Sequence, residues 1–221
     1  MADYPTAARP IVGHPLPVRV NLVEIGLISN QDLLDLTSCS RRMCREVVLN
    51  ASPPDSTMET PDSPLTYRIA SGDAITEEIP RIYRLYAEEL PELVKAYTGI
   101  SIVPSKFRRS AITLNLLSQG ERYEMHVDSN SVTGLLYANS LSKADGGALR
   151  LYYPGSEGPF DIQPVAGDFL LYDARWVPHE VSTVLTSEGR LSLPMNYFLD
   201  TDIESRPEHL DRYLFGGSSH L

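Results

Sequence analysis

Residues 111–138, AITLNLLSQGERYEMHVDSNSVTGLLYA, contain three short apolar runs separated by polar and glycine-containing turns. The same rhythm continues to residue 199, with turn residues recurring about every eight to twelve positions. Such spacing is typical of the short strands of an all-β sandwich or barrel. The predicted strands are 111–117, 123–127, 132–138, 148–153, 160–163, 168–172, 179–185 and 190–199.

The sequence before residue 110 shows helical rather than alternating periodicity. Residues 30–49 carry a loose apolar stripe, and Asn30 is a candidate N-cap. Residues 75–98 repeat apolar side chains at helical spacing, but Pro91 should kink or divide that helix, and Gly99 is a plausible stop. Helices before a β-rich half give an α+β layout.

Two further segments carry the marks of irregular structure. Residues 1–20 are rich in proline and predict an irregular arm. Residues 51–66 hold four prolines among Ser, Asp and Thr, which predicts a surface loop or a lid.

Composition and charge exclude several classes of function. The chain has 221 residues and a formal net charge of −10, which disfavours a nucleic-acid binder and suits an anionic membrane poorly. No apolar run is long enough to span a bilayer, and no secretory signal is recognisable. We read Cys39 and Cys44 as reduced thiols and expect a cytoplasmic protein with no nucleic-acid or membrane partner.

The segment His126-Val127-Asp128 carries the first chemical signal. Side chains two apart on a strand share a face, so this imidazole and this carboxylate can bind one metal ion. His179, at the start of a later strand, is the natural third ligand. Two histidines and one carboxylate suit a non-haem Fe(II) oxygenase, although a His-x-Asp segment alone is a weak signal that occurs by chance.

Arg190 and Ser192 open the last predicted strand and share a face. A guanidinium can hold a carboxylate through two parallel hydrogen bonds, and the serine hydroxyl can add a third. A cation facing the barrel interior needs such a partner, whereas a solvent-exposed Arg after a turn does not.

Residues 107–200 resemble the Fe(II)/2-oxoglutarate-dependent dioxygenase superfamily, especially the prolyl-4-hydroxylase and hypoxia-factor prolyl hydroxylase branch. The resemblance is carried, in order and spacing, by five motifs. They are Tyr123-Glu-Met-His-Val-Asp128, Val132-Thr-Gly-Leu-Leu-Tyr-Ala-Asn139, Gly146-Gly-Ala-Leu-Arg-Leu151, Pro178-His-Glu-Val181 and Arg190 with Tyr197-Phe198.

The resemblance implies a double-stranded β-helix (jelly-roll) core with N-terminal helices packed on the major sheet. We expect one domain, in which residues 1–109 form an arm and supporting helices, 110–200 the catalytic core and 201–221 a tail.

The same resemblance implies the roles of individual residues. His126, Asp128 and His179 would bind Fe(II), while Arg190 and Tyr137 would hold the distal carboxylate of 2-oxoglutarate. The cosubstrate would be O2, the products succinate and CO2, and ascorbate a candidate supporting reductant. Related halogenases lack the carboxylate ligand, so its presence favours hydroxylation.

Three departures from that branch concern the substrate. Leu116, or Asn115 if the alignment slips by one, stands where the branch has a tyrosine. Arg190 lies two residues further from the distal His than in the branch, and the loop 129–131 is short.

Candidate substrate contacts are Tyr123, Arg150, Arg175 and Trp176. We expect hydroxylation of an aliphatic C–H bond of a small molecule, such as an amino acid or a biosynthetic intermediate. The alternatives are a prolyl or other side-chain hydroxylase acting on a protein, a non-catalytic metal and 2-oxoglutarate sensor, and a nucleic-acid demethylase, which the charge disfavours.

Overall fold

The structure, a computed structural model, describes residues 18–49, 65–202, 204 and 210–215. The strands are β1 (Val18–Asn21), β2 (Arg45–Leu49), β3 (Leu65–Ala70), β4 (Ile102–Pro104), β5 (Leu114–Leu117), β6 (Tyr123–His126), β7 (Val132–Tyr137), β8 (Leu149–Leu151), β9 (Phe160–Ile162), β10 (Asp168–Tyr172), β11 (His179–Val181) and β12 (Arg190–Leu199).

The helical segments are α1 (Asn30–Met43), α2 (Gly72–Glu78), α3 (Pro80–Arg84), the π-helical turn η1 (Leu85–Glu89), α4 (Leu90–Thr98), α5 (Arg108–Ala111), the 3₁₀ turn η2 (Lys143–Asp145) and α6 (Leu210–Phe215). No helix in the described ranges is long and apolar enough to cross a membrane.

The strands form two antiparallel sheets. The larger sheet has the order β1-β10-β7-β12-β5-β3-β2, with β4 paired to β12, and the smaller sheet has the order β6-β11-β8-β9. From β5 to β12 the chain crosses repeatedly between the sheets, with β5, β7, β10 and β12 in one and β6, β8, β9 and β11 in the other. This alternation is the predicted jelly roll.

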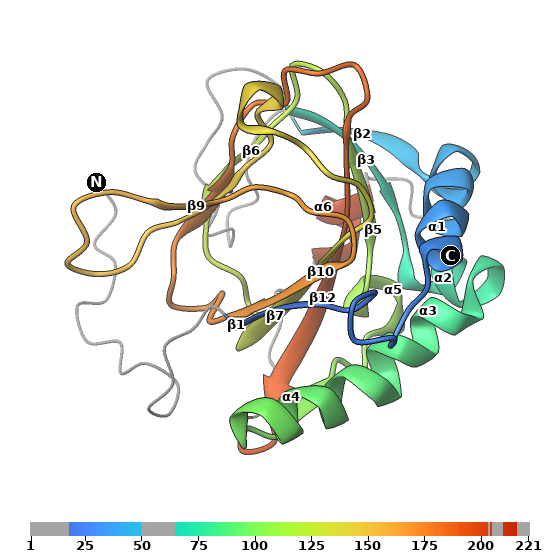
Figure 1. Ribbon diagram of the computed structural model, residues 1–221, viewed down its shortest axis with the longest axis vertical. Helices are drawn as coiled ribbons and strands as arrows, with labels where there is room; N and C mark the ends of the chain where they lie inside the picture. The colour runs from blue at the N-terminus through green and yellow to red at the C-terminus, as the bar shows by residue number, and fades with distance from the viewer. Residues whose placement is uncertain (1–17, 50–64, 203, 205–209, 216–221) are drawn as a thin grey trace.

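Each face of the larger sheet buries a separate apolar cluster. The outer face packs against the helices through residues such as Ile82, Leu90 and Leu193, and Figure 1 shows α1 to α4 along this side of the sheet. The inner face meets the smaller sheet, where Leu135 and Leu151 belong to one buried cluster. The predicted α+β class, with helices on the major sheet, is therefore confirmed.

The predicted helix 30–49 is too long. It ends at Met43, and residues 45–49 form β2, which pairs with β3. The β-branched pair Val47 and Val48 suits a strand, and the partner strand supplies the backbone hydrogen bonds. The cap is Ser29 rather than Asn30, because the Ser29 hydroxyl accepts from the backbone of Asp32 in a reciprocal capping box.

The predicted helix 75–98 begins earlier and is divided. It starts at Gly72, breaks before Pro80, and passes through a π-helical turn at Leu85–Glu89 that ends two positions before Pro91. A proline has no N–H to donate to the preceding turn, and the wider turn accommodates that missing bond. Gly99 ends the helix in the left-handed region, at φ 73°.

Four short strands escaped prediction: β1, β2, β3 and β4. The end of the expected irregular arm is β1, which pairs with β10, and residues 65–66 of the expected loop begin β3. The rest of the proposed lid, residues 51–64, lies outside the described residues. Part of the expected tail forms α6.

Gly134 on β7 gives a test of the packing between this sheet and its helices. A Cβ at Gly134 would lie 2.7 Å from the Phe169 ring and 3.0 Å from the Tyr197 ring. We expect Gly134→Ala to lower the free energy of unfolding by about 1–3 kcal/mol, because overpacking a buried sheet forces neighbouring rings to move. Urea unfolding measures it, with Gly158→Ala as control because a Cβ there meets open space. Equal midpoints for both variants would contradict the packing described.

Candidate metal centre

His126, Asp128 and His179 converge at one end of the barrel interior. Asp128 Oδ1 lies 3.5 Å from His126 Nε2 and 3.7 Å from His179 Nε2. Potential ligand atoms of the three residues all lie within 4.8 Å of one another, close enough to share one ion. The two histidines are directly opposite each other on β6 and β11, so strand pairing brings them together.

Asp128 reaches this cluster from a loop, not from the predicted strand. The strand β6 ends at His126, and the backbone N–H of Asp128 donates to the carbonyl oxygen of Ala174 at 2.9 Å. The loop after β10 therefore fixes the chain direction at Asp128. The predicted proximity is present, although alternation along one strand is not its cause.

The pairing of β6 with β11 contains an irregularity that shapes the site. His179 pairs with His126, and Val181 pairs with Tyr123, so β6 has one more residue than β11 in this interval. Such a bulge changes which side chains share a face. It allows both Tyr123 and His126 to point into the interior, which strict alternation would forbid.

Both histidines present the same ring nitrogen to the cluster. His126 Nδ1 lies 2.7 Å from the carbonyl oxygen of Glu124, and His179 Nδ1 lies 3.0 Å from the carbonyl oxygen of Val177. A carbonyl accepts, so each Nδ1 carries the proton and each Nε2 keeps its lone pair for a metal.

The charges at the cluster favour the ligand forms of two residues. Burial raises the pKa of Asp128, but the two imidazoles and the Thr133 hydroxyl outweigh it and lower that pKa to about 2. Burial and the neighbouring His126 lower the pKa of His179 to about 4. Burial also lowers the pKa of His126, but the hydrogen bond and charge of Asp128, together with the Glu124 carbonyl, outweigh burial and leave the pKa raised. At neutral pH the site holds an anionic carboxylate and a neutral His179 imidazole.

Arg190 and Ser192 lie inside the barrel on β12, as predicted. The Arg190 side chain is buried; its Nε donates to the carbonyl oxygen of Gly147 at 3.0 Å, and its Nη1 to Ser192 Oγ at 2.7 Å. Within the described ranges, no carboxylate pairs with this guanidinium. A buried cation held by neutral groups alone fits an anionic ligand.

Tyr137 completes this polar end of the barrel. It is directly opposite Ser192 on the neighbouring strand, and the Arg190 guanidinium lies 5.1 Å from its ring centroid. Its hydroxyl is buried and forms no hydrogen bond of good geometry among the described residues. Because burial raises the pKa of Tyr137 by more than the nearby Arg190 guanidinium lowers it, the hydroxyl keeps its proton and can donate to a carboxylate.

The structure shows which of the two residues predicted at the position of the branch's tyrosine faces the barrel interior. Asn115, not Leu116, shares the inner face with Ser192, its partner on β12, while Leu116 packs with the helix-side cluster. Asn115 Nδ2 donates to Tyr123 Oη at 3.1 Å, which places Tyr123 inside the barrel as well.

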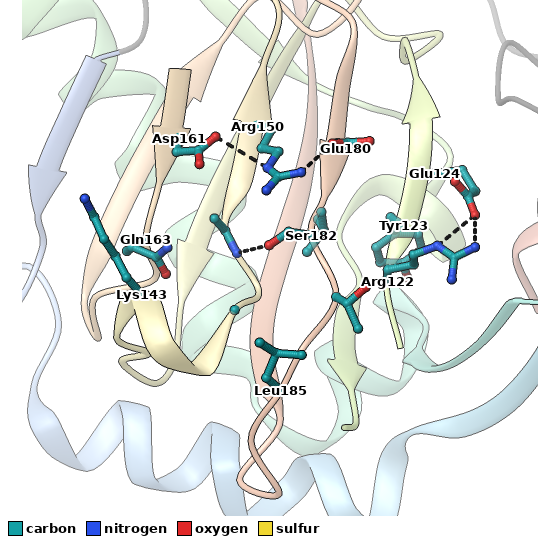
Figure 2. Close-up of a pocket in the computed structure, with 14 residues that line it drawn as sticks. Arg122, Tyr123, Glu124, Lys143, Arg150, Asp161, Gln163, Glu180, Ser182 and Leu185 are labelled. Carbon is teal, nitrogen blue, oxygen red and sulfur yellow. Dashed lines mark hydrogen bonds and ion pairs between the residues drawn. The ribbon is translucent and has the colours of Figure 1, made fainter. Parts of the chain in front are cut away.

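Arg150 is not brought together with the metal-ligand cluster. It lies between the interior residues Leu149 and Leu151, so its side chain points to the outer face of the smaller sheet. There it contacts Glu180 at 3.1 Å and Asp161 at 3.5 Å, in a pocket of about 540 Å³ (Figure 2).

Arg175 and Trp176 lie beside the cluster on the loop that precedes β11. Arg175 donates to the carbonyl oxygen of Ser129 at 3.3 Å and contacts Asp202 at 3.6 Å, and Asp202 also accepts from Ser131. This contact ties the short loop after Asp128 to the end of β12. Trp176 is 38% exposed, which leaves part of its ring accessible to a substrate.

Comparison with known proteins identifies the core. Residues 112–198 match the sequence model of the 2OG-Fe(II) oxygenase superfamily. These residues belong to that superfamily. The predicted 2-oxoglutarate-dependent dioxygenase, with Fe(II) and 2-oxoglutarate as cofactors, is therefore confirmed. A search of curated proteins found no match.

Three solved structures share this oxygenase fold. A 2OG-Fe(II) oxygenase family oxidoreductase from Burkholderia pseudomallei is 15% identical, with a TM-score of 0.61, over 85% of this chain and 92% of that one. A Pseudomonas putida prolyl-4-hydroxylase is 20% identical, with a TM-score of 0.56, over 83% and 92%. The non-heme alpha-ketoglutarate-dependent epimerase SnoN from nogalamycin biosynthesis is 15% identical, with a TM-score of 0.56, over 82% and 78%. At such identities the likeness establishes the fold.

Metal titration tests the cluster of His126, Asp128 and His179 directly. We expect the apo protein to bind one Co(II), and both His126→Ala and His179→Ala to abolish detectable binding, because each removes an aligned nitrogen ligand. Calorimetry measures the binding. The control is Asp161→Asn, which removes a carboxylate from the outer face of the smaller sheet and should leave the affinity unchanged. Equal losses in the control and the His variants would contradict the assignment.

Proposed function

We propose that His126, Asp128 and His179 hold the Fe(II) of this dioxygenase. The observation that carries the proposal is the alignment of two Nε2 atoms and Asp128 Oδ1 on one point, with both Nδ1 atoms engaged by backbone carbonyls. One carboxylate and two imidazoles leave coordination positions open, as an iron that must also bind a cosubstrate and O2 requires. When bound, the iron would supply the oxidative decarboxylation of 2-oxoglutarate to succinate and CO2.

The distal carboxylate of 2-oxoglutarate would pair with Arg190, with Tyr137 and Ser192 as hydroxyl partners. In the part of the chain that the structure describes, no carboxylate pairs with the buried guanidinium and no hydrogen bond of good geometry reaches the buried hydroxyl, which supports this assignment. A dicarboxylate supplies both missing interactions at once.

The substrate we propose is a small molecule with an aliphatic C–H bond to be hydroxylated. The loop after Asp128 is short and is held down by Arg175 and Asp202, which limits the room beside the metal. Tyr123 inside the barrel and Trp176 at its rim are the candidate contacts. Arg150, on the outer face of the smaller sheet, is no longer among them.

A protein prolyl hydroxylase is the second candidate. The Pseudomonas putida prolyl-4-hydroxylase is among the structures with this fold, and the sequence motifs resemble that branch. Asn115 in place of the branch's tyrosine argues against binding a prolyl substrate in the same way, because an amide cannot supply the ring and hydroxyl of a tyrosine.

Binding of 2-oxoglutarate can be measured without oxygen or substrate. We expect the Fe(II) protein to develop the visible charge-transfer band of a chelated 2-oxo acid. Arg190→Ala should weaken 2-oxoglutarate binding by about 10- to 100-fold, since it removes a charge-assisted contact of about 1.5–3 kcal/mol. Tyr137→Phe should weaken it by about 10-fold, because its hydroxyl would donate a charge-assisted hydrogen bond to a carboxylate, worth about 1.5 kcal/mol at the lower end. Arg150→Ala is the control and should match the wild type. A normal band and affinity in Arg190→Ala would contradict the assigned cosubstrate pocket.

Succinate formation distinguishes the two substrate classes. We expect free amino acids or biosynthetic small molecules to increase succinate release above the background rate without substrate, and prolyl peptides to leave it unchanged. The complementary measurement is the mass of the substrate, which should rise by one oxygen atom. Stimulation by a prolyl peptide together with its hydroxylation would favour the protein hydroxylase instead.

A further inference from the structure

The two oxygens of Asp128 have different neighbours. Oδ1 faces the Nε2 atoms of His126 and His179 at 3.5 and 3.7 Å, whereas Oδ2 accepts a hydrogen bond from Thr133 Oγ1 at 2.6 Å. The latter length is that of a charge-assisted O–H···O⁻ bond. The carboxylate is therefore held from the side that faces away from the two histidines.

The direction of the Thr133 proton is fixed by Asn130. The Asn130 amide nitrogen donates to Thr133 Oγ1 at 2.9 Å, so the hydroxyl accepts there and keeps its own proton for Asp128. The same nitrogen donates to the carbonyl oxygen of Val132 at 2.8 Å. Rotating the Asn130 amide by a half-turn would place its oxygen against the Val132 carbonyl oxygen. The Val132 carbonyl and the Thr133 hydroxyl therefore both require the amide nitrogen on their side.

The chain of hydrogen bonds from Asn130 through Thr133 to Asp128, called the relay below, is buried and lies against the larger sheet. Asn130 is 3% exposed and Thr133 is 2% exposed, so water does not compete for their hydrogen bonds. Thr133 shares the inner face of β7 with Tyr137 and pairs with Tyr172 on one side and Asn196 on the other. Three strands of the larger sheet thus fix the position of the hydroxyl.

We propose that Thr133, oriented by Asn130, is a positioning residue that restricts Asp128 to binding the metal through Oδ1 alone. A carboxylate that turned both oxygens to the metal would occupy a position needed by the cosubstrate or O2. The inference rests on the proposed metal site but goes beyond it, because it assigns the second oxygen and the residues that hold it away. Neither Thr133 nor Asn130 belongs to the ligand set predicted from the sequence.

A matched pair of variants tests the relay in the apo protein. Thr133→Val replaces the hydroxyl by a methyl group of similar size and keeps a β-branched residue on the strand, whereas Thr133→Ser keeps the hydroxyl. We expect the Val variant to bind Co(II) about 10-fold more weakly, the lower end of the effect of removing an outer hydrogen bond to a metal ligand. The Ser variant should bind within about 3-fold of the wild type, because it retains that hydrogen bond.

The visible absorption of bound Co(II) gives a readout that packing alone would not change. If Asp128 turns to bind through both oxygens in the Val variant, the coordination number rises and the absorption per metal falls, while the Ser variant keeps the wild-type spectrum. Thermal unfolding of the two apo variants checks that both are folded.

The outcomes separate this inference from the proposed function. Wild-type affinity and spectrum in Thr133→Val would overturn the relay while leaving the metal site intact. Equal losses in the Val and Ser variants would also overturn it, since they would reflect packing rather than the hydroxyl. A wild-type protein that binds no Co(II) would instead overturn the metal site, and the relay with it.

Discussion

The pairing of β6 with β11 is the constraint on which the rest of the site depends. It places His126 directly opposite His179, and its bulge turns Tyr123 inward on the same strand. Neither histidine could reach the other by local sequence, because they are 53 positions apart and the strands between them include β7 and β10 of the larger sheet. A one-residue slip in this pairing would turn one imidazole out of the barrel, so the bulge and the two histidines must be specified together.

The two faces of the larger sheet differ in polarity and in function. Toward the helices it is apolar and tightly packed, to the point that Gly134 leaves no room for a methyl group. Toward the smaller sheet the same strands carry Arg190, Ser192, Tyr137, Thr133 and Asn115 among apolar neighbours. Buried polar groups are costly unless they are paired. Those with partners fix the geometry of the site, and those without partners mark where a ligand fits.

The sequence was sufficient for the strands of the core, because period-two apolar runs are local signals, whereas the three residues of the cluster were predicted from the resemblance, since a His-x-Asp segment alone is a weak signal. It was insufficient where a partner far along the chain decides the structure. Residues 45–49 become a strand only because β3 pairs with them, and residues 18–21 only because β10 does. Thr133 could have been predicted to face the barrel interior, because it lies four positions before Tyr137 on the same strand. Its hydrogen bond to Asp128 could not, because the path of the loop that carries Asp128 is set by the carbonyl of Ala174. Arg150 was misplaced because alternation was not applied between Leu149 and Leu151.

The contact of Asp202 with Arg175 and Ser131 has a consequence for how the protein is made. The loop that follows Asp128 receives this partner from the segment just beyond β12. A chain emerging from the ribosome exposes its N-terminal residues first, and contacts distant in sequence form only when both partners are available. His126 and Asp128 therefore leave the ribosome before Asp202, the residue that contacts Ser131 in the loop between β6 and β7. The centre reaches its finished form late in biosynthesis, when the barrel's last strand is already in place.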